Sequence, residues 1–244
     1  VDMHDDPAGV IRKKPNSSMV VGLKLLADGD GDAFVSAGST GALLTGATPL
    51  ESGYKYDSRI FGEFCGELGG DYQQKNTNTL LSAIRILCDK GFGITGDSLR
   101  KGFENVCSLT GFMGRWQKIQ DNPRVVCDAG HNIGGIRYIT EQLERVDCRQ
   151  LRIVFGMVND KDITSVLKMM PKNAIYYFTQ ASIKRAMHAD ELKKMAKGYG
   201  LNGNSHPTVK QALEAAITES SNDDFIFVGG SCFIVADLLS ALEK

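Results

Sequence analysis

The chain has 244 residues, of which 42% are hydrophobic and 23% are charged, and its 28 basic residues nearly balance its 29 acidic ones. This composition is typical of a globular protein with ample core material, and the near-neutral charge gives no indication of nucleic acid or an anionic membrane as a general partner. No apolar run approaches the roughly 18 residues that a membrane span requires.

The six cysteines are scattered through the chain and form no CxxC pair. Several lie inside apolar segments, where a free cysteine behaves as a small hydrophobic residue. We therefore expect reduced core cysteines, no metal site and a cytoplasmic protein.

Residues 1–47 form a small unit with the order helix, strand, Gly-rich turn and helix. Apolar spacing predicts a helix over Met19–Ala27, a short strand over Ala33–Ala37 and the start of another helix over Ala42–Gly46. The turn between the last two consists of Gly38, Ser39, Thr40 and Gly41. Its amides and hydroxyls could bind a phosphate, or it could be a tight turn without a ligand. It lacks the lysine of a Walker motif.

This first unit resembles an internal piece of bacterial phosphate acyltransferase in Met3–Pro7, Arg12–Ser18 and Asp32–Leu43. That family makes acyl phosphate from acyl-carrier protein for phospholipid synthesis. The piece is a small part of a much longer enzyme, and Ser39 stands where the family usually shows Asn. The later catalytic portion has no counterpart, so the resemblance leaves a phosphate acyltransferase activity only as an alternative.

The character of the sequence changes after Pro49. The stretch Glu51–Asp57 is polar, and Arg59–Cys65 alternates weakly, as an edge strand does. This change, which we call the seam, indicates a natural fusion, a recombination or a misassembled reading frame. We predict three domains, with boundaries at 1–47, 48–111 and 112–244.

Two helices are expected after the seam. The first covers Asp71–Lys90, and the second covers Leu99–Val106 behind a cap at Thr95–Ser98. Gln73 and Asn76 share a face of the first helix, and their amide groups suit the edge of an adenine. The alternative is that they only cap and solvate the helix start. A linker follows at 110–114.

From Val125 onward the elements alternate between strand and helix. Strands are expected near 125–128, 152–157, 174–180 and 225–229, and helices near 133–146, 161–170, 189–198, 208–219 and 232–243. This alternation predicts an α/β domain with a Rossmann-like, mainly parallel sheet flanked by helices, preceded by small α/β and helical fragments. No GxGxxG follows the first strand, so a dinucleotide is not implied.

A polar loop from Asp128 to Asn132 follows the first of these strands. A turn that contains glycine and opens a helix presents free backbone N–H groups and the positive helix end, which favours an anion or nucleotide. The alternative is that Asn132 caps the helix while Asp128 and His131 are merely solvated.

Three motifs together resemble the folylpolyglutamate synthase and dihydrofolate synthase family, relatives of the Mur ligases. They are Gly70–Asn76, Gly114–Gln117 and Asp128–Asn132, continued by Phe155–Asp162 and Gly229–Ser231. The resemblance implies that 48–111 is the seam plus the tail of a central ATPase domain. It also implies that 112–244 is a Mur ligase C-terminal domain.

The family resemblance implies an ATP-dependent ligase with ATP and Mg²⁺ as cofactors. Such an enzyme phosphorylates a folate or pteroate carboxylate, and the amine of glutamate then attacks the acyl phosphate. The ATP-binding residues that it implies are Gln73, Asn76, Arg115, Asp128 and His131. Arg115 would contact ATP phosphates, Asp128 the ribose or Mg²⁺, and His131 the nucleotide. No catalytic residue is assigned.

The chain lacks the Walker loop on which that chemistry depends. We therefore expect negligible ligase turnover by the chain alone, with folate or pteroate and glutamate as partners only if a P-loop domain is supplied. The alternatives are the acyltransferase-type enzyme and a non-catalytic globular domain. For Arg115 the alternative is an exposed linker arginine.

Overall fold

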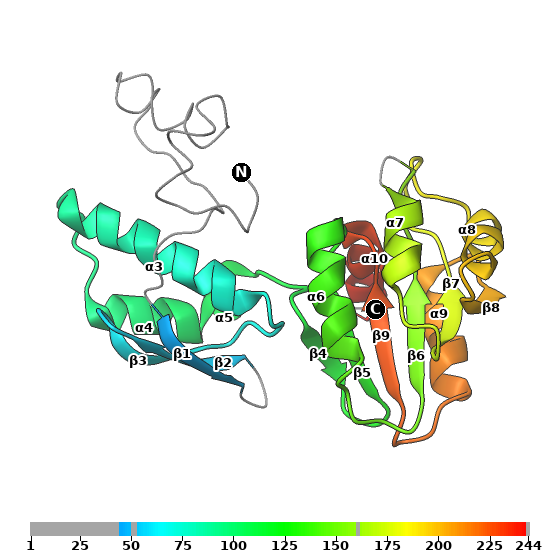
Figure 1. The fold of residues 1–244 in the computed structure, drawn as a ribbon, viewed down its shortest axis with the longest axis horizontal. Coiled ribbons are helices and arrows are strands. Elements are labelled where there is room, and N and C mark those ends of the chain that lie inside the picture. The colour runs from blue at the N-terminus through cyan, green and yellow to red at the C-terminus, as the bar shows by residue number, and fades with distance from the viewer. Residues whose placement is uncertain (1–43, 50–52, 160–161, 243–244) are drawn as a thin grey trace. The chain divides into compact units, whose positions relative to one another are not determined.

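The computed structural model describes residues 44–49, 53–159 and 162–242, which fall into two compact units (Figure 1). The first unit contains the described residues up to Glu67 together with Gln73–Val106. The second contains Leu68–Tyr72 together with the described residues from Cys107 onward. None of the helices in the described ranges is long and apolar enough to cross a membrane. The predicted elements of residues 1–41 and the phosphate turn Gly38, Ser39, Thr40 and Gly41 lie outside the described residues.

The first unit combines a three-stranded antiparallel sheet with helices. Its strands, in spatial order, are β1 (Leu44–Pro49), β2 (Tyr54–Ser58) and β3 (Gly62–Gly66). Its helices are α3 (Gln73–Asp89) and α4 (Gly96–Glu104), and the short α5 (Val106–Thr110) follows. Its core consists of Tyr54, Tyr56, Phe64, Leu81 and Leu99.

One prediction in this unit is wrong. Ala42–Gly46 was expected to begin a helix, but Leu44–Gly46 lies in β1, which pairs with β2 in an antiparallel register. In β2 the buried Tyr54, Tyr56 and Ser58 alternate with exposed residues, so this strand has one face on the core. Pairing with such a strand is a non-local interaction that overrides a weak local helix preference.

The cap of α4 is confirmed and forms a reciprocal capping box. Ser98 N–H donates to Thr95 Oγ1 at 3.1 Å, and Thr95 N–H donates to Ser98 Oγ at 2.9 Å. Replacing Thr95 with alanine should cost about 1 kcal/mol of local helix stability, because the first-turn donors lose an acceptor. The measurement is amide hydrogen exchange in α4, with Thr79→Ala in α3 as the control. Unchanged exchange in α4 would contradict this expectation.

The second unit is built on a six-stranded sheet with the order β4-β5-β9-β6-β7-β8. All neighbouring pairs are parallel except β4 with β5, which is antiparallel. The strands are β4 (Gln117–Gln120), β5 (Arg124–Asp128), β6 (Leu151–Phe155), β7 (Ile175–Phe178), β8 (Asn202–Ser205) and β9 (Phe225–Gly229). The helices are α6 (Ile133–Leu143), α7 (Ile163–Met169), α8 (Ala189–Lys197), α9 (Val209–Thr218) and α10 (Cys232–Leu242). The predicted mainly parallel α/β sheet is confirmed.

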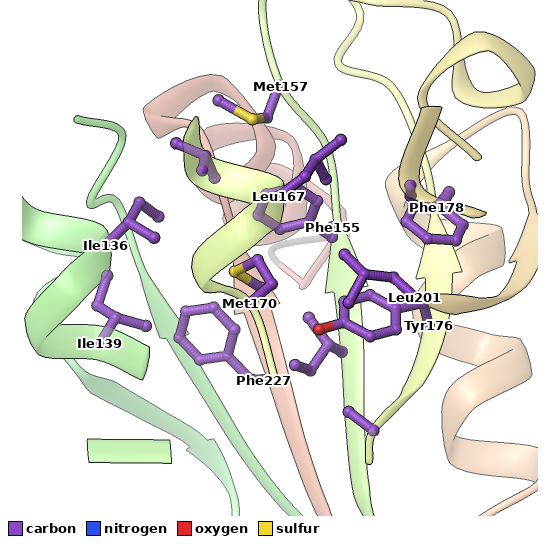
Figure 2. Packing of buried hydrophobic residues seen from close by; sticks show 14 of the residues in the cluster. Ile136, Ile139, Phe155, Met157, Leu167, Met170, Tyr176, Phe178, Leu201 and Phe227 are labelled. Carbon is purple, nitrogen blue, oxygen red and sulfur yellow. The ribbon is translucent and has the colours of Figure 1, made fainter. Parts of the chain in front are cut away.

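Helices cover both faces of this sheet. On one face, residues of α6, α7 and α8 pack on the strands, and Figure 2 shows Ile136, Ile139 and Leu167 with Phe155 and Phe227 in this layer. On the other face, α9 and α10 pack on the alternate strand residues, such as Val154, Ile226 and Val228. The period of two along each strand therefore divides its apolar residues between two cores.

A buried ionic cluster lies near the amino ends of the strands. Arg152 in β6 is 6% exposed, and its Nε donates to Asp224 Oδ2 at 2.8 Å. Its Nη1 donates to the hydroxyl of Tyr177 at 2.6 Å, and Tyr177 donates in turn to Glu219 at 2.5 Å. Arg149 adds two further donors to Asp224 at 2.9 and 3.1 Å. The Arg152 charge is thus buried but fully paired.

Candidate functional site

Three segments of the second unit meet at the carboxyl end of β5. They are the loop Asp128–Asn132, the turn Gly114–Trp116 and the segment Leu68–Tyr72, which we call the strap. Asp128, in the first segment, accepts hydrogen bonds from Tyr72 of the strap, from Trp116 of the turn and from Gly130 of its own loop. In open α/β sheets, the carboxyl ends of the strands are where ligands bind.

The Asp128 carboxylate connects these segments. Its side chain is completely buried, with 0% exposure. Oδ2 accepts hydrogen bonds from the Tyr72 hydroxyl at 2.5 Å and from Trp116 N–H at 2.8 Å, and Oδ1 accepts one from Gly130 N–H at 2.7 Å. Both carboxylate oxygens are therefore engaged by protein donors, which gives Asp128 an internal organising role.

Burial raises the pKa of the Asp128 carboxyl. The hydrogen bonds from Tyr72, Gly130 and Trp116 and the positive charge of Arg115 oppose this rise. Each donor stabilises the ionised form, so losing one would favour the protonated form. Burial also raises the pKa of the neighbouring Cys127 thiol to about 12, which leaves it a neutral core residue at neutral pH.

Arg115 lies in a turn whose backbone is held in the left-handed region on both sides. Gly114 has a φ of 77° and Trp116 a φ of 46°. A Cβ on Gly114 would lie 2.9 Å from Val235 Cγ1, so this position needs glycine. The Arg115 Nη1 donates to Gly114 O at 3.1 Å, and its Cζ lies 5.1 Å from the ring centroid of Phe112. The half-buried guanidinium has five donors, enough to bind phosphate oxygens as well.

His131 and the start of α6 complete the loop. His131 Nδ1 lies 3.1 Å from Ala129 O, and since a carbonyl only accepts, Nδ1 carries the proton. This contact orients the half-buried ring and leaves Nε2 for another partner. Asn132 caps α6 by accepting from Gly135 N–H at 2.7 Å, so this part of the alternative interpretation is confirmed. The alternative that Asp128 is merely solvated is wrong, because that side chain is buried.

The glycine pair of the Gly229–Ser231 motif lies beside Asp128. Gly229 is in register with Asp128 of β5 on one side and with Phe155 of β6 on the other. A Cβ on Gly230 would lie 2.7 Å from Gly156 O, so a side chain there would push the backbones of the two turns apart. This close approach places the turns after β5, β6 and β9 along one edge of the sheet.

Gln73 and Asn76 belong to the first unit. They share a face of the first turn of α3, and Asn76 Nδ2 donates to Gln73 Oε1 at 3.0 Å. Gln73 is 6% exposed, whereas Asn76 is exposed. The pair is therefore ordered by its own hydrogen bond, with Asn76 facing outward.

Sequence reasoning missed two contacts of Asp128. Tyr72 and Trp116 both lie inside the motifs that resemble the family, next to the amide and arginine side chains that were predicted to contact ATP. Trp116 donates through its backbone, which no residue type reveals. For Tyr72, the signal was a phenol in the motif Gly70–Asn76, in which only Gln73 and Asn76 had been given a role.

Comparison with known proteins confirms both predicted resemblances. Residues 114–232 match the family model of the Mur ligase, glutamate ligase domain, and residues 1–55 match that of the fatty acid synthesis protein. The dihydrofolate synthase/folylpolyglutamate synthase of Escherichia coli is 27% identical over 173 residues, which are 70% of this chain and 38% of that protein. Its counterpart in Buchnera aphidicola is 29% identical over 147 residues, 59% of this chain and 34% of that protein. The chain thus spans little more than a third of these relatives.

Solved structures of similar proteins share the fold. The Mycobacterium tuberculosis folylpolyglutamate synthase complexed with ADP aligns with a TM-score of 0.66 at 21% identity, over 82% of this chain and 47% of that one. E. coli FolC in complex with DHPP and ADP aligns with a TM-score of 0.64 at 23% identity, over 81% and 45%. For the N-terminal part of the chain, the phosphate acyltransferase of Thermotoga petrophila is 64% identical over 50 residues, which are 20% of this chain and 15% of that protein.

Proposed function

We propose that residues 49–244 act as the C-terminal, nucleotide-contacting part of an ATP-dependent folate:glutamate ligase in the cytoplasm. The observation that carries the proposal is the Asp128 carboxylate, which holds the Arg115 turn and the His131 loop at the carboxyl edge of a parallel sheet. We assign ATP contacts to Arg115 and His131 in the second unit; the family-implied ATP contacts of Gln73 and Asn76 stay a prediction. A direct contact of Asp128 with ribose stays a prediction, whereas a contact with Mg²⁺ does not fit its fully engaged carboxylate.

The donor set at this edge fits the phosphates of ATP. Arg115 offers a planar cationic fork, and the first turn of α6 offers backbone N–H groups and the positive helix end. When bound, ATP would supply the phosphoryl group that activates a carboxylate. Here Arg115 would neutralise phosphate charge, while Asp128 keeps the turn in place.

Mg²⁺ does not fit Asp128 as it stands in this structure. Both carboxylate oxygens already accept hydrogen bonds from the protein, and the side chain has no exposed surface. The described residues also contain no group of three or more acidic, His or Cys side chains that could hold a metal ion. Asp128 therefore acts in the site as a hydrogen-bond acceptor for the protein rather than as a metal ligand.

We also propose that the isolated chain has no ligase activity. No Walker loop occurs in the 244 residues, so phosphoryl transfer lacks its phosphate-binding loop. Folate or pteroate and glutamate become partners only when a P-loop domain is supplied. The N-terminal match carries no activity proposal, because it covers 15% of the acyltransferase.

The test is a titration of the full chain with ATP and Mg²⁺, followed by the fluorescence of Trp116, the one tryptophan in the sequence. Arg115→Gln should weaken binding about tenfold or more, since a charged hydrogen bond contributes about 1.5–3 kcal/mol. Arg124→Gln is the matched control, because Arg124 lies at the opposite end of β5. Equal binding by all three proteins would contradict the assignment of Arg115.

A further inference from the structure

The strap is the part of the second unit that comes from far away in the sequence. Its residues, Leu68–Tyr72, precede α3, whereas the rest of the unit begins at Cys107. Asp71 N–H donates to Gln142 Oε1 of α6 at 3.0 Å, and the Asp71 carboxylate pairs with Arg145 just beyond that helix. Gly69 lies against Trp116, because a Cβ there would be 3.1 Å from the Trp116 Cβ.

Tyr72 ends the strap and reaches the centre of the site. Its hydroxyl donates to Asp128 Oδ2 at 2.5 Å, the same oxygen that accepts Trp116 N–H. Burial, followed by the charge of Asp128, raises the pKa of this phenol well above its ordinary value. The Tyr72 hydroxyl therefore stays protonated at neutral pH and donates its hydrogen bond to Asp128.

We infer that Tyr72 is a positioning residue of the nucleotide site, acting through Asp128 on the Arg115 turn and the His131 loop. Its hydroxyl fixes the carboxylate, and the fixed oxygens hold the backbone amides of Trp116 and Gly130. These amides are adjacent in sequence to Arg115 and His131. The inference rests on the proposed function for the nucleotide, but the hydrogen-bond relay itself does not.

If the hydrogen bond from Tyr72 to Asp128 only stabilised the fold, a different result would be expected. In that case, loss of the phenol would lower the stability of the second unit and leave the geometry of the remaining Asp128 contacts intact. A positioning role requires that the carboxylate rotates or shifts when the phenol is removed, since small displacements of supporting groups degrade a binding site. The amides of Trp116 and Gly130 then report the change directly.

The experiment compares the full chain with Tyr72→Phe and with Asp71→Asn. The Phe variant keeps the ring and removes only the donor, while the Asn variant weakens the strap at its ion pair with Arg145 and keeps the phenol. Amide NMR shifts of Trp116 and Gly130 and the affinity for ATP with Mg²⁺ are measured for all three. Urea unfolding followed by Trp116 fluorescence shows whether each variant is folded.

For Tyr72→Phe we expect shifted Trp116 and Gly130 amides and about fivefold weaker ATP binding in a folded protein. For Asp71→Asn we expect both signals close to wild type. Unmoved amides in a folded Tyr72→Phe variant, or equal effects of the two substitutions, would overturn the inference. If the wild type does not bind ATP, the proposed function fails, yet the two amides still decide whether Tyr72 positions Asp128.

Discussion

Replacing Arg152 with methionine is expected to destabilise the second unit by about 3–5 kcal/mol, the usual cost of removing one partner of a buried ion pair. Arg152 is 6% exposed and donates to Asp224, Tyr177 and the backbone of Glu219. Methionine fills a similar volume but leaves these acceptors without their shared donor. The loss would thus be electrostatic rather than a loss of packing.

Urea unfolding followed by Trp116 fluorescence measures this effect, because Trp116 packs against Phe225 and Phe227 in the second unit. Lys210→Met is the matched control. It also replaces a cation by methionine, but Lys210 is 67% exposed in a 3.9 Å pair with Glu214, so its effect should stay within about 0.5 kcal/mol. Equal midpoints for the two variants would show that the buried cluster contributes nothing.

The same cluster predicts an acid dependence. Burial acts to raise the pKa of Asp224, but the hydrogen bonds from Arg152 and Ser221 and the charge of Arg149 outweigh it and hold that pKa below its ordinary value. A carboxyl with a lowered folded-state pKa contributes stability above its unfolded pKa of about 3.9 and loses it as the pH falls through the folded value. The stability difference between wild type and Arg152→Met should therefore shrink below about pH 4. A difference that is constant with pH would contradict the role of the ionised carboxylate.

The second large effect is expected for Asp128→Asn. Asparagine has the same size, but its NH₂ group cannot accept, so at least one of the donors from Tyr72, Trp116 and Gly130 loses its partner. An unsatisfied buried donor costs about 1–3 kcal/mol, and more when it had bonded to a charge. We expect about 2–4 kcal/mol of destabilisation in urea unfolding, together with loss of ATP binding.

Asn132→Ala serves as the comparison for Asp128→Asn, because it removes one exposed cap from the same loop. It should cost about 1 kcal/mol and leave the Trp116 environment unchanged. An Asp128→Asn protein as stable as wild type, with Trp116 fluorescence unchanged, would mean that the three segments hold together without the carboxylate.

In the sheet of the second unit, the sequence predicted the strands that are rich in apolar residues and missed those that are not. β5, β6, β7 and β9 were expected, since their residues are nearly all apolar and buried. β4 and β8 were missed because QKIQ and NGNS lack an apolar pattern and lie at the two edges of the sheet. The role of Arg152 could not be predicted either, because the sequence does not show which residue neutralises a charge inside an apolar strand.

The candidate site was predictable in part for a similar reason. The loop Asp128–Asn132 follows a clear strand, so its place at the carboxyl edge followed from the pattern. The hydrogen bond of Asp128 with Tyr72 did not, because the two residues lie 56 positions apart in the sequence. Long-range contacts of this kind leave no period in a single sequence. The hydrogen bond from Asn76 to Gln73, by contrast, could be anticipated, because residues three apart in a helix share a face.

The most direct test of the nucleotide site is an NMR titration of the full chain with ATP and Mg²⁺. We predict shifts of the backbone amides in 114–116 and 130–133, where the Asp128 contacts hold the proposed phosphate donors. The amides of 219–224, in the ionic cluster, should not move. Saturating ATP that leaves 114–116 and 130–133 unchanged, or that moves only 219–224, would contradict the account.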